Sequence, residues 1–156
     1  MTSRKDFGDE EWTRIRRAPI VAGVAISLAD PGGPIEVAKE TAATLRSATL
    51  PPSQEELLAS VALDVQAMAQ HRQNPLGDFK PRGGQQVLEE LKEVNQLVTA
   101  KATPEEVEAF RRWLLAAAQA AADAGKEGGF LGFGGEQVSA GEQQMLDQVR
   151  AALGMT

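Results

Sequence analysis

The amino-acid sequence predicts an all-α protein, a single-domain bundle of about six helices. Apolar residues recur every three or four positions through four long segments, which is the spacing of a helix with one buried face. The period-two alternation typical of strands is nearly absent, and the chain is rich in alanine but only 4% aromatic. A chain of 156 residues can bury roughly two thirds of its unfolded surface in one core. We therefore expect residues 1–156 to form one helical domain, with residues 1–8 as a flexible N-terminal tail.

The first third of the chain predicts three short helices. Proline restricts the residue before it to extended backbone, so Pro19 predicts a break between a helix at 9–17 and a second helix at 19–28. The turn-forming residues 30–33 end the second helix. A proline then opens the next helix, at 34–47, in the position where its missing N–H costs nothing.

Three later helices carry a capping-box signature at their start. In this arrangement a serine or threonine hydroxyl and a glutamate three residues later satisfy backbone N–H groups that have no partner within the helix. The pairs are Ser53 with Glu56, Thr103 with Glu106 and Ser139 with Glu142, and they predict helices at 53–72, 104–124 and 139–153.

A further helix at 85–101 is the most clearly amphipathic of the set. One face is apolar and the other is charged, so we expect the apolar face to pack on the core and the charged face to meet solvent. The apolar residues are Val87, Leu88, Leu91, Val94 and Val98, and the charged residues are Glu89, Glu90, Lys92 and Glu93.

Composition excludes several classes of function. The chain has no cysteine, so it cannot form thiolate zinc sites, iron–sulfur clusters or a thiol nucleophile. Its net charge of −6 disfavours binding to the phosphate backbone of a nucleic acid, and we expect no such partner. The weakly polar run 18–29 is too short to span a bilayer, which takes about 20 residues. We expect a cytoplasmic protein with no transmembrane segment and no membrane-surface contact.

No catalytic motif is present in the sequence. The only histidine, His71, follows a helix at its polar end, where a cation suits the helix dipole. No pair of carboxylates is marked as lying in an apolar pocket, which acid–base catalysis would require. We therefore expect a non-enzymatic protein, with a carboxylate-based enzyme or small-ligand carrier as an open alternative in which acids from distant segments converge.

The glycine-rich stretch 126–138 is the most informative part of the sequence. It places Phe130, Leu131 and Phe133 among glycines between two helices, and these large apolar side chains need cover that a solvated linker does not give. Either they fold back as a plug on the bundle, or they bind a protein partner or a second copy of the chain. We expect a helical interaction or regulatory module with Phe130, Leu131 and Phe133 as its partner-binding residues.

The same region also suggests a second function. The pattern of Ala122, Asp123 and Gly125, followed by Ser139, Glu142 and Leu146, resembles the helical repeat of the TerB-like tellurite-resistance family. The resemblance covers the last third of the chain, but residues 126–138 form an insertion relative to the short loop of that family. It implies an all-helical bundle, a role in stress response and binding of a divalent cation by loop acids.

Hard cations such as Ca²⁺ or Mg²⁺ prefer several oxygen ligands, and Asp123, Glu127 and Glu136 are the candidates. The alternative is that these acids only cap helix termini or face solvent. Apart from such an ion, we expect no cofactor.

Overall fold

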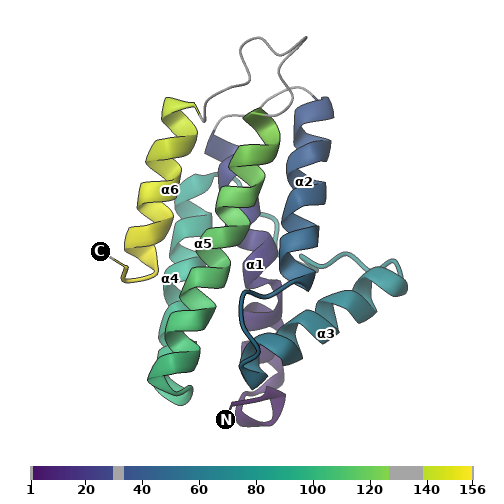
Figure 1. The fold of residues 1–156 in the computed structure, drawn as a ribbon, viewed down its shortest axis with the longest axis vertical. Coiled ribbons are helices and arrows are strands. Elements are labelled where there is room, and N and C mark those ends of the chain that lie inside the picture. The colour runs from purple at the N-terminus through teal and green to yellow at the C-terminus, as the bar shows by residue number, and fades with distance from the viewer. Residues whose placement is uncertain (1, 30–33, 127–138, 156) are drawn as a thin grey trace.

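The computed structural model describes residues 2–29, 34–126 and 139–155. Within these residues the chain forms six α-helices and one short 3-10 helix and contains no strand, which confirms the predicted all-α bundle (Figure 1). The elements are η1 (Arg4–Asp6), α1 (Asp9–Ala29), α2 (Pro34–Thr49), α3 (Glu56–Gln70), α4 (Gly84–Lys101), α5 (Pro104–Lys126) and α6 (Ala140–Ala152).

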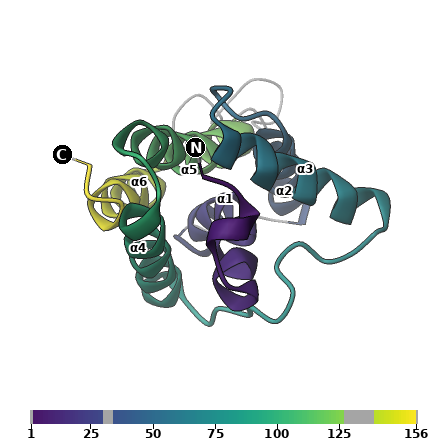
Figure 2. The same cartoon turned by 90° about the horizontal axis from the view of Figure 1, so that it is seen from below.

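Helix α1 lies at the centre of the bundle. It contacts each of the other five α-helices, and the view along the bundle places it between α4 and α6 on one side and α2 and α3 on the other (Figure 2). Helices α2 and α5 make the most extensive helix–helix contact. Helix α3 projects sideways from the bundle and makes smaller contacts with α1, α2 and α5 (Figure 1). Buried alanines of α1 and α5, together with the buried Gly23 of α1, allow close approach of helices.

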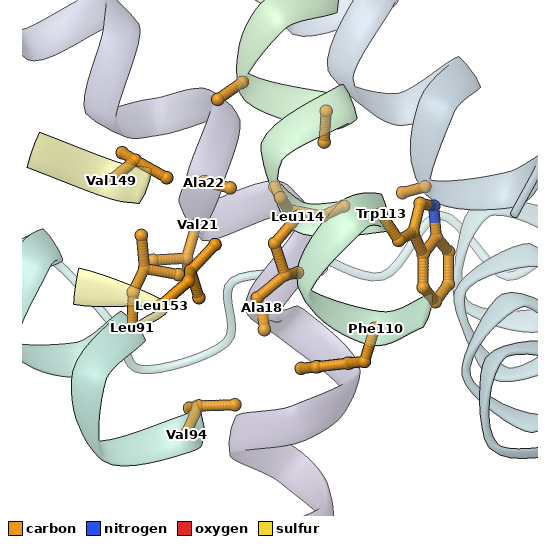
Figure 3. Close-up of a cluster of buried hydrophobic side chains, with 14 of the residues drawn as sticks. Ala18, Val21, Ala22, Leu91, Val94, Phe110, Trp113, Leu114, Val149 and Leu153 are labelled. Atoms are coloured by element: carbon orange, nitrogen blue, oxygen red, sulfur yellow. The ribbon is translucent and has the colours of Figure 1, made fainter. Parts of the chain in front are cut away.

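The core is formed by side chains from all six α-helices. Phe110 and Trp113 meet edge to face, with ring centroids 6.4 Å apart and planes at 82°. Burial of each large apolar side chain contributes about 1.5–3 kcal/mol. The labelled side chains of Figure 3 are Ala18, Val21 and Ala22 of α1, Leu91 and Val94 of α4, Phe110, Trp113 and Leu114 of α5, Val149 of α6 and Leu153 just after it.

The predicted break at Pro19 is wrong, because α1 is one continuous helix of 21 residues with Pro19 inside it. Proline in a helix removes one hydrogen bond and crowds the preceding turn. Ala18, Ile20 and Val21 on either side are fully or almost fully buried against neighbouring helices. Packing of this central helix therefore outweighs the local preference for a break.

Two of the three predicted capping boxes are confirmed. Thr103 and Ser139 each exchange a pair of 3.2 Å bonds with the glutamate three residues on, Glu106 and Glu142. The box at Ser53 is wrong: α3 begins at Glu56, with Glu55 as an N-cap that makes no side-chain bond. The first residues of this segment to be fully buried are the two leucines after Glu56, so the helix begins where packing begins.

Residues 2–8 differ from the expected flexible tail, because they are docked on the bundle. The backbone N–H of Thr2 donates to Glu106 Oε2 over 2.9 Å, and its hydroxyl donates to Glu106 Oε1 over 2.6 Å. Phe7 is buried with its ring centroid 6.0 Å from that of Trp12. Burial alone would raise the pKa of Glu106, but the bonds from Thr2 and Thr103 outweigh burial and lower it.

Candidate functional site

A buried ion cluster joins α1 to α4, and the sequence pattern placed one of its members wrongly. Glu90 was expected on the solvent face but is only 7% exposed. Arg14 Nη2 donates to Glu90 Oε1 over 2.6 Å, and Arg17 Nη2 donates to Glu90 Oε2 over 3.0 Å. The guanidinium of Arg17 also lies 4.8 Å from the ring centroid of Phe79, which the loop before α4 supplies. The sequence did contain one signal, the arginine-rich run 14–17 of α1. An arginine that is partly buried in a helix bundle needs an acidic partner.

The electrostatics of this cluster favour the charged forms of its members. Desolvation alone would raise the pKa of Glu90, but the hydrogen bonds from Arg14 and Arg17 outweigh it, so this pKa lies below its usual value. The bond to Glu90 raises the pKa of the Arg14 guanidinium. Because both arginines are engaged with Glu90, the cluster acts as a structural clamp between α1 and α4.

A neighbouring pocket of about 440 Å³ borders the cluster. Its lining residues are Asp9, Glu10, Thr13, Arg14, Arg17 and Asp78. The two positively charged side chains of this lining, Arg14 and Arg17, already form ion pairs with Glu90. The other charged lining residues are the acids Asp9, Glu10 and Asp78.

A second concave surface lies between α2 and α5, and we call it the α2–α5 groove. It has a volume of about 330 Å³ and is lined mainly by small side chains. Two features stand out: Leu50 at its edge is 67% exposed, and the groove carries one cation and one anion, Arg46 and Asp123. The lining residues are Ala43, Arg46, Ser47, Leu50, Ala120, Asp123 and Ala124.

A side-chain hydrogen bond joins the two helices that border the α2–α5 groove. Trp113 of α5 is fully buried, and its indole Nε1–H donates to the carbonyl oxygen of Ser47 over 2.8 Å. This bond ties α5 to the end of α2 at Ser47, which also lines the groove. The groove is therefore a preformed feature of the α2–α5 pair, which is the most extensive helix contact in the bundle.

Most of the site residues expected from the sequence lie outside the described residues. These are Phe130, Leu131 and Phe133 among the partner-binding candidates, and Glu127 and Glu136 among the metal candidates. The remaining candidate, Asp123, lies near the end of α5, lines the α2–α5 groove and accepts a 3.0 Å hydrogen bond from Gln119. In the part of the chain that the structure describes, no three histidine, aspartate or glutamate residues are grouped so as to hold a metal ion.

Comparisons with known proteins find no match, so a proposed function has to be argued from the residues of this chain. No protein-family model, no curated protein and no solved structure matches this chain. Among the described helices, none combines the length and the apolar character needed to cross a lipid bilayer.

Proposed function

We propose that this protein is a non-enzymatic helical interaction module. Its contact surface comprises the α2–α5 groove and the glycine-rich residues 126–138 that follow α5. The observation that carries the proposal is Leu50, which is 67% exposed at the edge of a groove lined by alanines. Among the described residues, the large apolar side chains that are exposed are Val37, Leu50 and Leu63.

The energetics of an exposed leucine support a contact role. Transfer of a leucine side chain from water to an apolar site contributes about 1.5–3 kcal/mol, and a preformed concave surface lowers the cost of binding. The alanines of the groove expose apolar methyl groups while leaving room for the side chain of a partner. Phe130, Leu131 and Phe133 follow Ala124 by six to nine positions in the sequence, so we assign them to the same proposed contact surface.

Capture of partners and native mass spectrometry test the proposal together. We expect the wild type to retain a protein partner or a second copy, and we expect Leu50→Ser to weaken that retention. The double variant Phe130→Ser with Phe133→Ser tests the contribution of the glycine-rich segment. The matched control is Leu63→Ser, because Leu63 is 64% exposed but lies on α3 and does not line the groove.

The proposal fails if the Leu50 variant and the double phenylalanine variant both keep the partners and the subunit mass of the wild type. It also fails if the Leu63 control weakens retention as much as Leu50→Ser does, because the effect would then be one of general surface hydrophobicity.

Cation binding, as the resemblance to TerB-like proteins implies, stays a prediction. Calorimetry and thermal melting in millimolar Ca²⁺ or Mg²⁺ test it, because an ion that binds the native state raises its melting temperature. Absence of both heat and thermal shift would remove this alternative, whereas loss of a shift in Asp123→Asn would support it.

A further inference from the structure

We infer that residues 2–7 form a releasable strap, which is latched to the bundle by the carboxylate of Glu106 and opens while the helices stay folded. The latch is in the first turn of α5, whereas the α2–α5 groove takes residues from the second half of that helix. The inference therefore goes beyond the proposed function, and either can fail without the other.

The strap is anchored to the bundle near its two ends. At one end the backbone N–H and the hydroxyl of Thr2 donate to the two carboxylate oxygens of Glu106, over 2.9 and 2.6 Å. At the other end the ring of Phe7 packs 6.0 Å from that of Trp12, and the ammonium nitrogen of Lys101 lies 5.4 Å from the centroid of the Phe7 ring. Thr2 is only 3% exposed and Phe7 only 8%, so docking removes both anchors from water.

Between these anchors the strap is exposed and makes weak contacts. Arg4, Lys5 and Asp6 all face solvent. Arg4 lies 3.7 Å from Asp64, but its side chain is 60% exposed, and such surface ion pairs contribute little to stability. The carbonyl oxygen of Asp6 accepts a 2.9 Å bond from the exposed amine of Lys101. Most of the docking free energy therefore comes from the two anchors.

The backbone hydrogen bonds in the middle of the strap do not tie it to the helices. The N–H of Asp6 donates to the carbonyl oxygen of Ser3 over 3.0 Å, and the N–H of Phe7 donates to that of Arg4 over 3.2 Å. Ordering the backbone of one residue costs about as much free energy as one hydrogen bond contributes, so a segment with two anchors lies close to balance between docked and released states. Segments of this kind open locally without global unfolding. Gly8, which is exposed and joins the strap to α1, provides the hinge.

Glu106 holds the strap and α5 with the same carboxylate. Its Oε1 accepts the hydroxyl of Thr2 and also the backbone N–H of Thr103, over 3.2 Å. The cap is local to the first turn of α5, so it persists when Thr2 leaves. Release exposes the facing rings of Phe7 and Trp12, which form an apolar surface that the docked state buries.

Native-state hydrogen exchange of the full chain at low urea concentration tests the inference. The probes are the amides of Asp6 and Phe7, because a single helical turn is not stable once it leaves the bundle. In the wild type we expect both amides to be protected, yet to exchange about tenfold or more faster than the core amides of Val21 and Leu114.

Two variants weaken the latch in different ways. Glu106→Gln removes the charge, and Thr2→Val removes the hydroxyl bond but leaves Glu106 and its cap intact. We expect each to speed exchange at Asp6 and Phe7 by about tenfold, with a much smaller change at Leu114.

Glu142→Gln is the matched control. Glu142 is 7% exposed and makes the same kind of capping box with Ser139. It lies at the start of α6, at the other end of the bundle from the N-terminus (Figure 1). We expect this variant to leave exchange at Asp6 and Phe7 unchanged.

Four outcomes would overturn the inference. If Asp6 and Phe7 exchange as slowly as Leu114 in the wild type, the strap opens only with the whole bundle. If they exchange as fast as an unstructured peptide, the strap is not docked. If Glu106→Gln and Thr2→Val leave their exchange unchanged, or if Glu142→Gln speeds it as much, the carboxylate of Glu106 is not the latch.

Discussion

A close approach between α1 and α2 provides the sharpest test of the fold. Gly23 of α1 faces Thr44 of α2, and both residues are buried. A Cβ atom added at Gly23 would lie 2.1 Å from Thr44 Oγ1, 2.3 Å from Cγ2 and 2.7 Å from Cβ. These distances are shorter than a Cβ tolerates, so Gly23→Ala must displace Thr44 or separate the two helices.

The magnitude follows from how little Thr44 can move. Its side chain is β-branched, and its hydroxyl donates to the carbonyl oxygen of Glu40 over 2.8 Å. Overpacking of a core costs about 1–3 kcal/mol, and the contact with Cβ places this case at the upper end. Alanine regains about 1 kcal/mol of helix propensity over glycine. We expect Gly23→Ala to lower the free energy of unfolding by about 2 kcal/mol.

Urea and thermal unfolding measure this effect. A loss of about 2 kcal/mol corresponds to a decrease in melting temperature of roughly 4–8 °C for a domain of this size. The matched control is Gly84→Ala, where the added Cβ would meet only the terminal methyl of Met145, at 2.6 Å. That methyl ends a flexible side chain, so we expect the control to stay within about 0.5 kcal/mol of the wild type.

Relief of the clash provides a second control. Thr44→Ala removes the two atoms nearest to the added Cβ but leaves the third, so we expect the double variant with Gly23→Ala to show a favourable coupling. A Gly23→Ala variant as stable as the wild type would refute the close approach of α1 and α2.

Three further predictions concern contacts that join distant segments. Glu90→Gln should lower stability by about 2 kcal/mol at pH 7 in urea melts. Because the folded-state pKa of Glu90 is lowered, its stabilisation is present above the unfolded pKa of about 4.3 and is lost as pH falls through the folded value. A difference between variant and wild type that did not shrink toward pH 3 would contradict this assignment. Glu106→Ala should cost about 1 kcal/mol and speed amide exchange at Thr2, measured by hydrogen exchange; unchanged exchange would argue against the docking of residues 2–8. Trp113→Phe should cost about 1–2 kcal/mol in the same urea melts through the lost bond to Ser47, and a neutral result would show that this bond does not hold the two helices together.

Helix boundaries set by local chemistry were predictable from the sequence. The capping boxes at Thr103 and Ser139 are contained within four residues each, so the pattern alone determines them. The same pattern at Ser53 failed because the helix begins where its leucines reach the core, and that position depends on packing with other helices. Local signals therefore located two of these three helix starts.

Features that depend on contacts across the chain were not predictable. Glu90 is 76 residues from Arg14, and no local pattern marks the two as partners. The continuity of α1 through Pro19 likewise depends on helices that lie far along the sequence. The α2–α5 groove joins residues about 70 to 80 positions apart, and only the fold brings Leu50 and Asp123 into the lining of one groove.

The central position of α1 has a consequence for synthesis of the protein. Helix α1 is translated before the other five α-helices of the described residues, yet it packs against α6, the last of them. Its apolar surface therefore stays without its full set of neighbours until α6 has been translated. A nascent chain in this state exposes Val21, Ile26 and similar side chains, which makes it a substrate for chaperones and prone to aggregation if translation stalls before α6.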